Sequence, residues 1–279
     1  MRNNEILKNL ICPCCGAEMT VSDCEKTLYC KGERRHCFDL SANGYVNFAG
    51  NRGATGDAKA AVRSRTDFLN KGYYQPIVEE LVKIINKHKP NGFVIDAGCG
   101  EGYYTQKVFE AGHSVLGLDL SKFAIHSVAS RLKCKTNDKA FACVSSIFEM
   151  PVKDACADIV LSIFAPCAEA EINRVLSPGG ILVVVSAGRD HLMGLKKALY
   201  ETAYQNDVRA DMPNDMVLCE QVSLDYSINL ASNDDILNLF SMTPYYFRTS
   251  QSDFEKLKGL DTLETKIDIT FSVYKKESK

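Results

Sequence analysis

Cysteines and a histidine near the start of the chain have the composition and spacing of a zinc site. Cys12 and Cys15 form a tight Cys-x-x-Cys turn, and a second turn begins at Cys30 and ends at the neighbours His36 and Cys37. Zinc takes four soft or borderline ligands in a tetrahedron, and each turn can supply half of that set. A segment this short has no core of its own, so metal binding would supply its folding free energy.

The fourth zinc ligand is open at this point. His36 and Cys37 are adjacent, so both do not easily face one metal, and either could complete the set. Cys14 and Cys24 are surplus to a site of four ligands. The alternative to zinc is a set of free thiols. Disulfides are not expected, because we see no apolar run typical of a secretion signal and therefore expect a reducing, cytoplasmic location.

A second chemical feature is a glycine-rich turn between a short strand and a helix. The apolar run 93–95 is followed by Asp96, and Gly98, Gly100 and Gly102 stand at alternate positions after it. Glycine lets the backbone turn sharply and lets a ligand approach closely. Doubly wound α/β folds bind nucleotide-like cofactors at such turns.

The spacing around this turn favours S-adenosylmethionine as the cofactor. Asp119 ends the next expected strand, where a carboxylate can bond ribose hydroxyls. The Asp-x-Gly-x-Gly-x-Gly pattern departs from a dinucleotide fingerprint and resembles the first motif of S-adenosylmethionine-dependent methyltransferases. That cofactor has a carboxylate that backbone N–H groups could receive, and cationic groups that an acidic side chain could balance. The alternative is a turn that binds no cofactor.

Short apolar runs alternate with helical patterns, which predicts a parallel sheet with helices on both faces. The expected strands are 93–95, 114–118, 140–144, 159–164 and 181–186, then one within 216–230 and a last one at 267–273. The expected helices are 58–69, 77–88, 103–111, 122–132, 169–176, 192–204, 234–240 and 253–257. The sequence therefore predicts a Rossmann-like, doubly wound α/β fold.

The overall composition is typical of a soluble globular protein, with 279 residues, 46% apolar and 24% charged. The net charge of −2 gives no global hint of a nucleic-acid partner, and no stretch is long enough to span a membrane. Residues 1–66 hold ten Lys/Arg and seven Asp/Glu, a net of +3, whereas the remainder has a net of −5. A basic front end could contact phosphates, although an ordinary solvated surface explains it equally well.

Several further motifs join the zinc turns and the glycine turn. They are Cys-Pro-x-Cys at 12–15, His-x-Phe-Asp at 36–39, Gly-Tyr-Val-Asn at 44–47, Phe-Leu-x-x-Gly-x-Tyr-Gln-Pro at 68–76, Ala-Pro-Cys at 165–167, Arg-x-His-Leu-Met-x-Leu-Lys at 189–196 and Met-Thr-Pro at 242–244. With this combination the chain resembles, nearly end to end, the bacterial 23S ribosomal RNA (guanine-N1)-methyltransferases.

The resemblance implies roles for particular residues. Cys12, Cys15, Cys30 and His36 fall on zinc ligands, although the second turn is two residues longer than the family spacing and keeps Cys37 as an alternative. Four further residues fall on positions that contact S-adenosylmethionine in the family: Tyr74, Gly100, Glu101 and His191. Core packing is an equally good explanation for Tyr74, and a backbone-bonded helix start is the alternative for His191.

The resemblance also implies domains and a substrate. We expect a zinc-binding RNA-recognition module at 1–48, a linker at 49–66 and a methyltransferase domain at 67–279. The expected substrate is N1 of a guanine in a 23S ribosomal RNA hairpin. A homodimer is compatible with the sequence, which does not fix the oligomeric state.

Methylation at N1 requires the base to be unpaired or flipped out, and requires an acceptor for the N1 proton. The sequence names no such acceptor. Phe164 follows an expected strand and could stack on the base, with core packing as the alternative, and Cys167 is expected to be inert. The candidates for phosphate contacts are Arg34, Arg35, Arg52, Arg63 and Arg65. The rival functions are a small-molecule methyltransferase and a non-catalytic, zinc-bearing RNA-binding protein.

Overall fold

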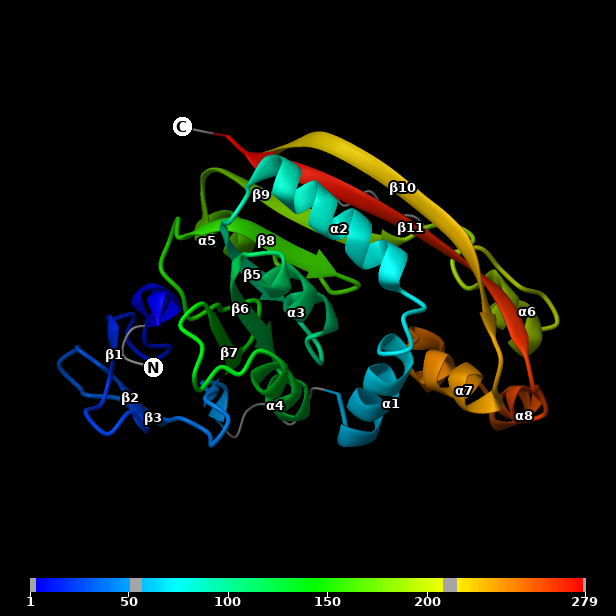
Figure 1. Ribbon diagram of the computed structural model, residues 1–279, viewed down its shortest axis with the longest axis horizontal. Coiled ribbons are helices and arrows are strands. Elements are labelled where there is room, and N and C mark those ends of the chain that lie inside the picture. Colours follow the sequence, from blue (N-terminus) through cyan, green and yellow to red (C-terminus); the bar gives the residue numbers. More distant parts are fainter. Residues whose placement is uncertain (1–3, 51–56, 208–214, 278–279) are drawn as a thin grey trace.

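The computed structural model describes residues 4–50, 57–207 and 215–277. Within these residues, eight strands form one main sheet in the order β10-β11-β9-β8-β5-β6-β7-β4 (Figure 1). Its strands are β4 (Val46–Asn47), β5 (Phe93–Ala97), β6 (Ser114–Asp119), β7 (Ala140–Val144), β8 (Ala157–Ile163), β9 (Leu176–Ala187), β10 (Met216–Leu230) and β11 (Leu263–Lys276).

The centre of the main sheet is parallel, as the sequence predicts. Strand β5 pairs with β6 and β8, and the pairing continues in parallel to β7 on one side and β9 on the other. Strand β11 then runs antiparallel between β9 and β10. The α/β fold class is confirmed. Residues 178–180 lie inside β9, where the pairing with β8 shifts register.

Helices cover one face of this sheet. They are α2 (Gln75–His88), α3 (Tyr103–Glu110) and α4 (Lys122–Arg131), which lie in front of the sheet in Figure 1. Their apolar side chains form one core with alternate strand residues such as Val94 and Val115. No helix in the described part of the chain is long and apolar enough to cross a membrane.

The opposite face is covered largely by the N-terminus. The 3₁₀ helix η1 (Glu5–Asn9) packs Ile6 and Leu7 against that face, beside Leu10 and the helix α5 (Glu169–Val175). These residues share a core with Ile95 in the centre of the sheet. Neighbouring strand residues point to opposite faces, so the two cores lie on either side of the sheet.

The segment that holds the candidate zinc ligands follows η1 and Leu10 in the chain. It contains the small sheet of β1 (Met19–Val21), β2 (Thr27–Cys30) and β3 (Cys37–Asp39). The chain then enters the main sheet, because β4 pairs in parallel with β7. Residues 46 and 47, expected in the zinc module, therefore lie in the main sheet.

The long antiparallel strands β10 and β11 carry a helical cap at one end (Figure 1). It consists of α7 (Asn233–Ser241), η3 (Pro244–Phe247) and α8 (Gln251–Lys258), which lie beside α6 (Met193–Leu199). Helix α1 (Lys59–Leu69) contacts α7, and just beyond it Lys71 and Tyr73 bond the buried Asp235 carboxylate. Residues 59–66 of the expected linker are thus helical and packed, whereas 51–56 lie outside the described residues.

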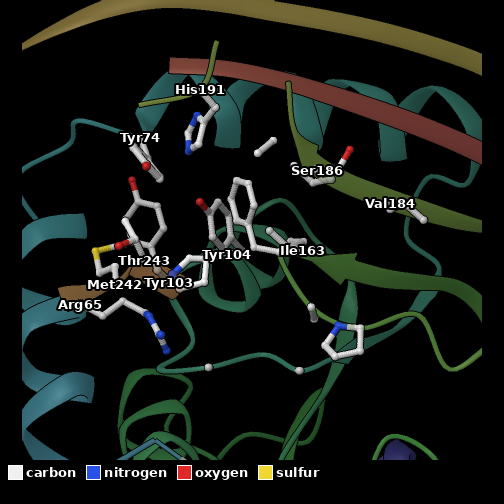
Figure 2. A pocket seen from close by; sticks show the side chains of 18 of the residues that line it. Arg65, Tyr74, Tyr103, Tyr104, Ile163, Val184, Ser186, His191, Met242 and Thr243 are labelled. Carbon is white, nitrogen blue, oxygen red and sulfur yellow. The ribbon is translucent and has the colours of Figure 1, made fainter. Parts of the chain in front are cut away.

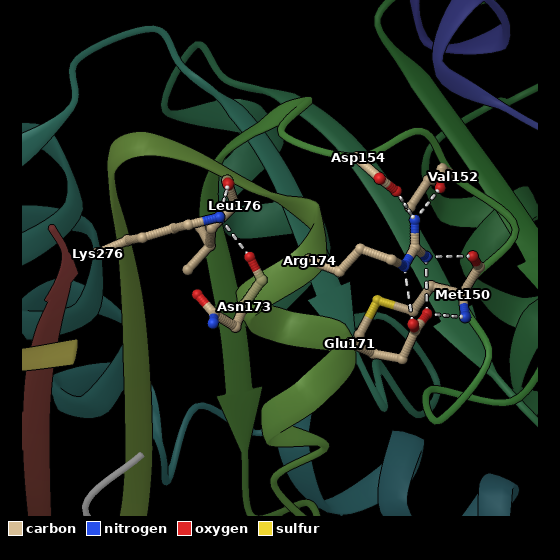
Figure 3. A network of polar contacts seen from close by, with 8 residues as sticks. All are labelled: Met150, Val152, Asp154, Glu171, Asn173, Arg174, Leu176 and Lys276. Atoms are coloured by element: carbon tan, nitrogen blue, oxygen red, sulfur yellow. Dashed lines mark hydrogen bonds and ion pairs between the residues drawn. The ribbon is translucent and has the colours of Figure 1, made fainter. Parts of the chain in front are cut away.

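An arginine network holds the N-terminal segment in place (Figure 3). Arg174 on α5 donates to both Glu171 carboxylate oxygens and to the carbonyl oxygens of Met150 and Val152, at 2.7–2.8 Å. These bonds fix residues 150–152. Val152 in turn forms a β-bridge with Leu10 of the N-terminal segment. The network therefore stabilises the residues against which the N-terminal segment packs.

We predict that Arg174→Met lowers the free energy of unfolding by about 2 kcal/mol, because it leaves the Glu171 carboxylate and two carbonyls without their donor. Urea unfolding measures the loss. Limited proteolysis should also cut residues 1–48 faster. The control is Lys83→Met, which removes an exposed pair with Glu80 and should cost below about 0.5 kcal/mol. Equal stability of the two variants would contradict the supporting role.

Candidate active site and metal centre

Four of the five candidate zinc ligands meet at one point. The ligand atoms of Cys12, Cys15, Cys30 and His36 all lie within 4.8 Å of one another. His36 Nδ1 is 3.5 Å from both Cys12 Sγ and Cys30 Sγ, and Cys15 Sγ is 3.7 Å from Cys30 Sγ. Zn–S bonds of about 2.3 Å and Zn–N bonds of about 2.0–2.1 Å give tetrahedron edges of roughly 3.8 Å (S to S) and 3.6 Å (S to N). The cluster therefore fits zinc.

The surrounding residues support the same four ligands. Cys37 is exposed and its thiol points to the Arg35 carbonyl, so His36 is the fourth member of the cluster. The His36 backbone N–H donates to Cys30 Sγ, which stabilises a thiolate. A Cβ on Gly32 would lie 3.1 Å from Cys15 Sγ, so glycine lets the second turn close over the first. The surplus Cys14 and Cys24 are exposed.

A second site is a cavity of about 1070 Å³ at the carboxyl ends of the parallel strands. The glycine turn after β5, the end of β6 and the loop after β8 line the cavity, and residues of the cap, including Met242 and Thr243, form one side of it (Figure 2). All seven residues expected to contact a cofactor are among its lining or turn residues: Tyr74, Asp96, Gly98, Gly100, Glu101, Asp119 and His191.

The glycine turn is held against the neighbouring loop. Gly98 has a φ of +84°, and a Cβ there would lie 2.8 Å from the Ala165 Cβ. No other residue type fits both the conformation and the contact. The N–H groups of Gly98 and Cys99 donate to the Leu118 carbonyl, which ties the turn to the end of β6. The backbone is therefore fixed before any ligand binds.

Two buried carboxylates beside the turn lack part of their bonding. Asp96 Oδ2 accepts from Thr105 at 2.6 Å, and Glu101 Oε2 pairs with Arg131 at 2.6 Å. Asp96 Oδ1 and Glu101 Oε1 are buried without a hydrogen-bond partner among the described residues. Burial raises the pKa of Asp96 to about 7 and also raises the pKa of Glu101. A ligand with a cationic or N–H group would complete both carboxylates.

The third acidic residue, Asp119, is already bonded to the backbone. Its two oxygens accept from the N–H groups of Gly100 at 3.0 Å and Ser121 at 2.7 Å. Each oxygen keeps a further lone pair, so the carboxylate can still accept from ribose hydroxyls. These bonds hold it at the edge of the glycine turn.

His191 enters the cavity next to aromatic side chains (Figure 2). Its Nδ1 accepts the Asp268 backbone N–H at 3.3 Å, which leaves the proton on Nε2. Burial and the nearby Lys196 lower the pKa of His191 to about 4, so the ring is a neutral donor at pH 7. The Phe164 ring stacks against it, 6.1 Å between centroids, and the buried Tyr74 lies 6.5 Å away.

The structure adds lining residues that the sequence did not indicate. Tyr104 has a buried hydroxyl without a hydrogen-bond partner among the described residues, and Asp57 and Arg65 form an ion pair at the cavity wall. Tyr104 follows directly on the glycine motif, which is a local signal. The cap residues and Asp57 reach the cavity only through tertiary packing, so no spacing rule could have found them.

The expected phosphate-binding arginines separate into two groups. Arg34 and Arg63 are exposed, and exposed Arg35 stacks over the Tyr29 ring at 3.7 Å. Arg65 faces the cavity and pairs with Asp57, whereas its expected role as a phosphate contact stays a prediction. Arg52 lies outside the described residues.

We predict that the purified protein holds one zinc ion per chain, measured by plasma mass spectrometry. Cys30→Ser should lose the metal and melt at a lower temperature, because zinc contributes folding free energy. Cys37→Ser is the matched control and should keep it. Loss of zinc in Cys37→Ser with retention in His36→Ala would overturn the ligand set.

A second prediction concerns His191. Since its pKa is lowered from 6.5 to about 4 in the folded protein, the unfolded chain binds more protons between these pH values. Stability should therefore fall as the pH drops through this window, by about 2 kcal/mol between pH 7 and pH 5. Urea unfolding of wild type and His191→Gln at both pH values isolates this contribution. The same pH dependence in both proteins would show that His191 is not held neutral.

Comparisons with known proteins agree with the fold. The sequence model of a family described as a methyltransferase domain matches residues 88–241. The YcgJ protein of Bacillus subtilis, a solved structure, has a TM-score of 0.50 at 12% identity and covers 72% of this chain and 98% of its own. At that identity the likeness shows the fold alone.

Two relatives are similar over most of the chain. A Streptomyces fradiae protein named 23S rRNA (guanine(748)-N(1))-methyltransferase is 35% identical over 208 residues, which cover 71% of this chain and 70% of that protein. YxjB of Bacillus subtilis (strain 168), named for 23S rRNA (guanine-N(1)-) methylation, is 29% identical over 92% of this chain and 94% of its own. The chain therefore belongs to the methyltransferase family, within the group of 23S rRNA (guanine-N1)-methyltransferases.

Proposed function

We propose that this enzyme transfers a methyl group from S-adenosylmethionine to N1 of a guanine in a 23S ribosomal RNA hairpin. The observation that carries the proposal is the cavity itself, in a chain whose relatives are named for that reaction. Its wall has two buried carboxylate oxygens that lack a hydrogen-bond partner among the described residues, beside a rigid glycine turn. A ligand that carries an ammonium, a sulfonium and a ribose matches this donor and acceptor set.

Each wall of the cavity suits one part of the cofactor. Asp96 and Glu101 would face its cationic groups, and Asp119 would accept from the ribose. The Nε2–H of His191 is a donor for one of its oxygen or nitrogen atoms. When bound, the cofactor supplies a methyl group on a positively charged sulfur.

The cavity has room for a second group beside the cofactor. Its volume of about 1070 Å³ is at the upper end of the ~300–1,000 Å³ usual for small-ligand pockets. Phe164 stands at the end of β8 with a φ of +52°, and 45% of its surface is exposed. A flipped guanine could stack on this ring, since nucleobases bind aromatic side chains in this way.

The proton on guanine N1 must leave for an acceptor as the methyl group arrives. His191 is not suited to this role at neutral pH. Its Nδ1 is occupied by a backbone N–H, its Nε2 carries the proton, and its pKa is about 4. The ring would instead position a partner by donating a hydrogen bond.

The zinc module is the part of the chain that would bind the RNA. We assign recognition to residues 1–48, where the exposed Arg34 and the stacked Arg35 are the candidate phosphate contacts. Residues 67–279, together with α1, would carry out the transfer.

We place the enzyme in the cytoplasm. We also propose that it can form a homodimer, because β10 is a long edge strand, and such edges can pair with a second copy.

The experiment that tests the proposal is transfer of a labelled methyl group. Protein-free 23S ribosomal RNA and a panel of small metabolites are offered separately with S-adenosylmethionine. Label in the RNA supports the proposal, and label only in metabolites supports the small-molecule alternative. If calorimetry detects no binding of S-adenosylmethionine, the protein is a binding module and the enzyme assignment fails.

Phe164 gives a residue-level prediction. Phe164→Ala should lower kcat/KM for RNA by about 10- to 100-fold, because stacking on one base contributes ~1–3 kcal/mol. The dissociation constant of S-adenosylmethionine should stay the same. Phe164→Tyr, which keeps the ring, is the control. Equal activity of Phe164→Ala and wild type would remove the stacking role.

A further inference from the structure

The charges that line the cavity are very uneven. Among its described lining residues there are five carboxylates but one permanently charged cation, which is Arg65. The carboxylates are Asp57, Asp96, Glu101, Asp119 and Asp207. His191 adds no charge at neutral pH, because burial keeps its ring unprotonated. A ligand that brings its own carboxylate into this cavity therefore has one fixed cation to meet.

Arg65 lies next to the glycine turn. It comes from α1, and a Cβ added to Gly100 would be 3.4 Å from the Arg65 Nη1 atom. The side chain is only 25% exposed, and its charge acts on both Glu101 and Asp119, whose pKa values it lowers against the effect of burial. The guanidinium thus lies on the ligand side of the turn.

The segment that carries Arg65 is fastened to the same edge of the sheet. Ser121 donates its hydroxyl to the Asp57 carbonyl at 2.7 Å, and the Ser121 N–H bonds Asp119. Asp57 in turn pairs with Arg65. These bonds hold the guanidinium near the cofactor turn, while Asp57 neutralises it when no anionic group is bound.

We propose that Arg65 binds the α-carboxylate of S-adenosylmethionine and so selects a cofactor that carries an amino-acid end. The inference rests on the proposed function, because it assigns a subsite for that cofactor. Arginine presents a planar pair of N–H donors that matches a carboxylate. The ammonium of the same amino-acid end would lie toward the unpaired oxygens of Asp96 and Glu101. Opposite charges of the ligand would therefore meet opposite charges of the wall.

The test compares S-adenosylmethionine with decarboxylated S-adenosylmethionine, which differs only by the missing carboxylate. Calorimetry on wild type should show that S-adenosylmethionine binds about 10- to 100-fold more tightly, as expected for a charge-assisted hydrogen-bonded pair. Arg65→Ala should lose this preference by weakening S-adenosylmethionine alone, and Arg65→Lys should keep part of it. Arg63→Ala is the matched control, since Arg63 is on the same helix but faces solvent.

Several results would overturn the assignment. Equal affinity of the wild type for both ligands would do so without any variant. An equal loss for both ligands in Arg65→Ala would mean a purely structural role, and loss of RNA affinity with an unchanged cofactor preference would mean a phosphate contact. Failure of the proposed function looks different, because the wild type would then bind neither ligand, or would bind both and methylate no RNA.

Discussion

The structure depends on how the second face of its central sheet is covered. In the described chain that face is covered largely by α5, residues 147–152 and the N-terminal residues, with Ile6, Leu7 and Leu10 buried against it. Burial of such side chains contributes about 1.5–3 kcal/mol each. The N-terminal segment is therefore part of the core that forms on this face of the main sheet. Because the zinc cluster follows directly on Leu10, the metal centre is fixed relative to the cavity.

This arrangement relates the two sites physically. Asn4 donates its side-chain N–H groups to carbonyls at and just before the start of β7, and β4 pairs with the same strand. The zinc module thus touches the sheet at both of its ends. A module held in this way keeps a constant position relative to the cavity, and each loss of packing or metal would disturb that position.

Two buried carboxylates in the cavity carry a desolvation cost that a bound ligand can offset. Asp96 and Glu101 are each 1% exposed, and each has one oxygen without a partner in the described chain. Burying such groups costs free energy unless they are bonded. The fold tolerates this cost at one place, beside the glycine turn, where a cationic ligand would repay it. Backbone bonds fix the turn in advance, so little ordering remains for the binding step.

Much of this could be predicted from local sequence patterns. The parallel strands, the glycine turn, Asp119 and the zinc set follow from residues that are close in sequence, and the structure brings the expected residues together. The roles of Ile6, Leu10, Arg65 and the cap depend on contacts between distant segments, which no periodicity encodes. Arg65 was expected on an RNA-binding surface because charge alone does not tell which way a helix faces.

Methyl transfer to N1 of guanine leaves a product that can be identified directly. The most direct measurement is mass spectrometry of the nucleosides released from 23S ribosomal RNA after incubation with the protein and S-adenosylmethionine. We expect 1-methylguanosine as the one new methylated nucleoside. Methylation at another atom or on another base, or no methylation at all in the presence of bound S-adenosylmethionine, would contradict it.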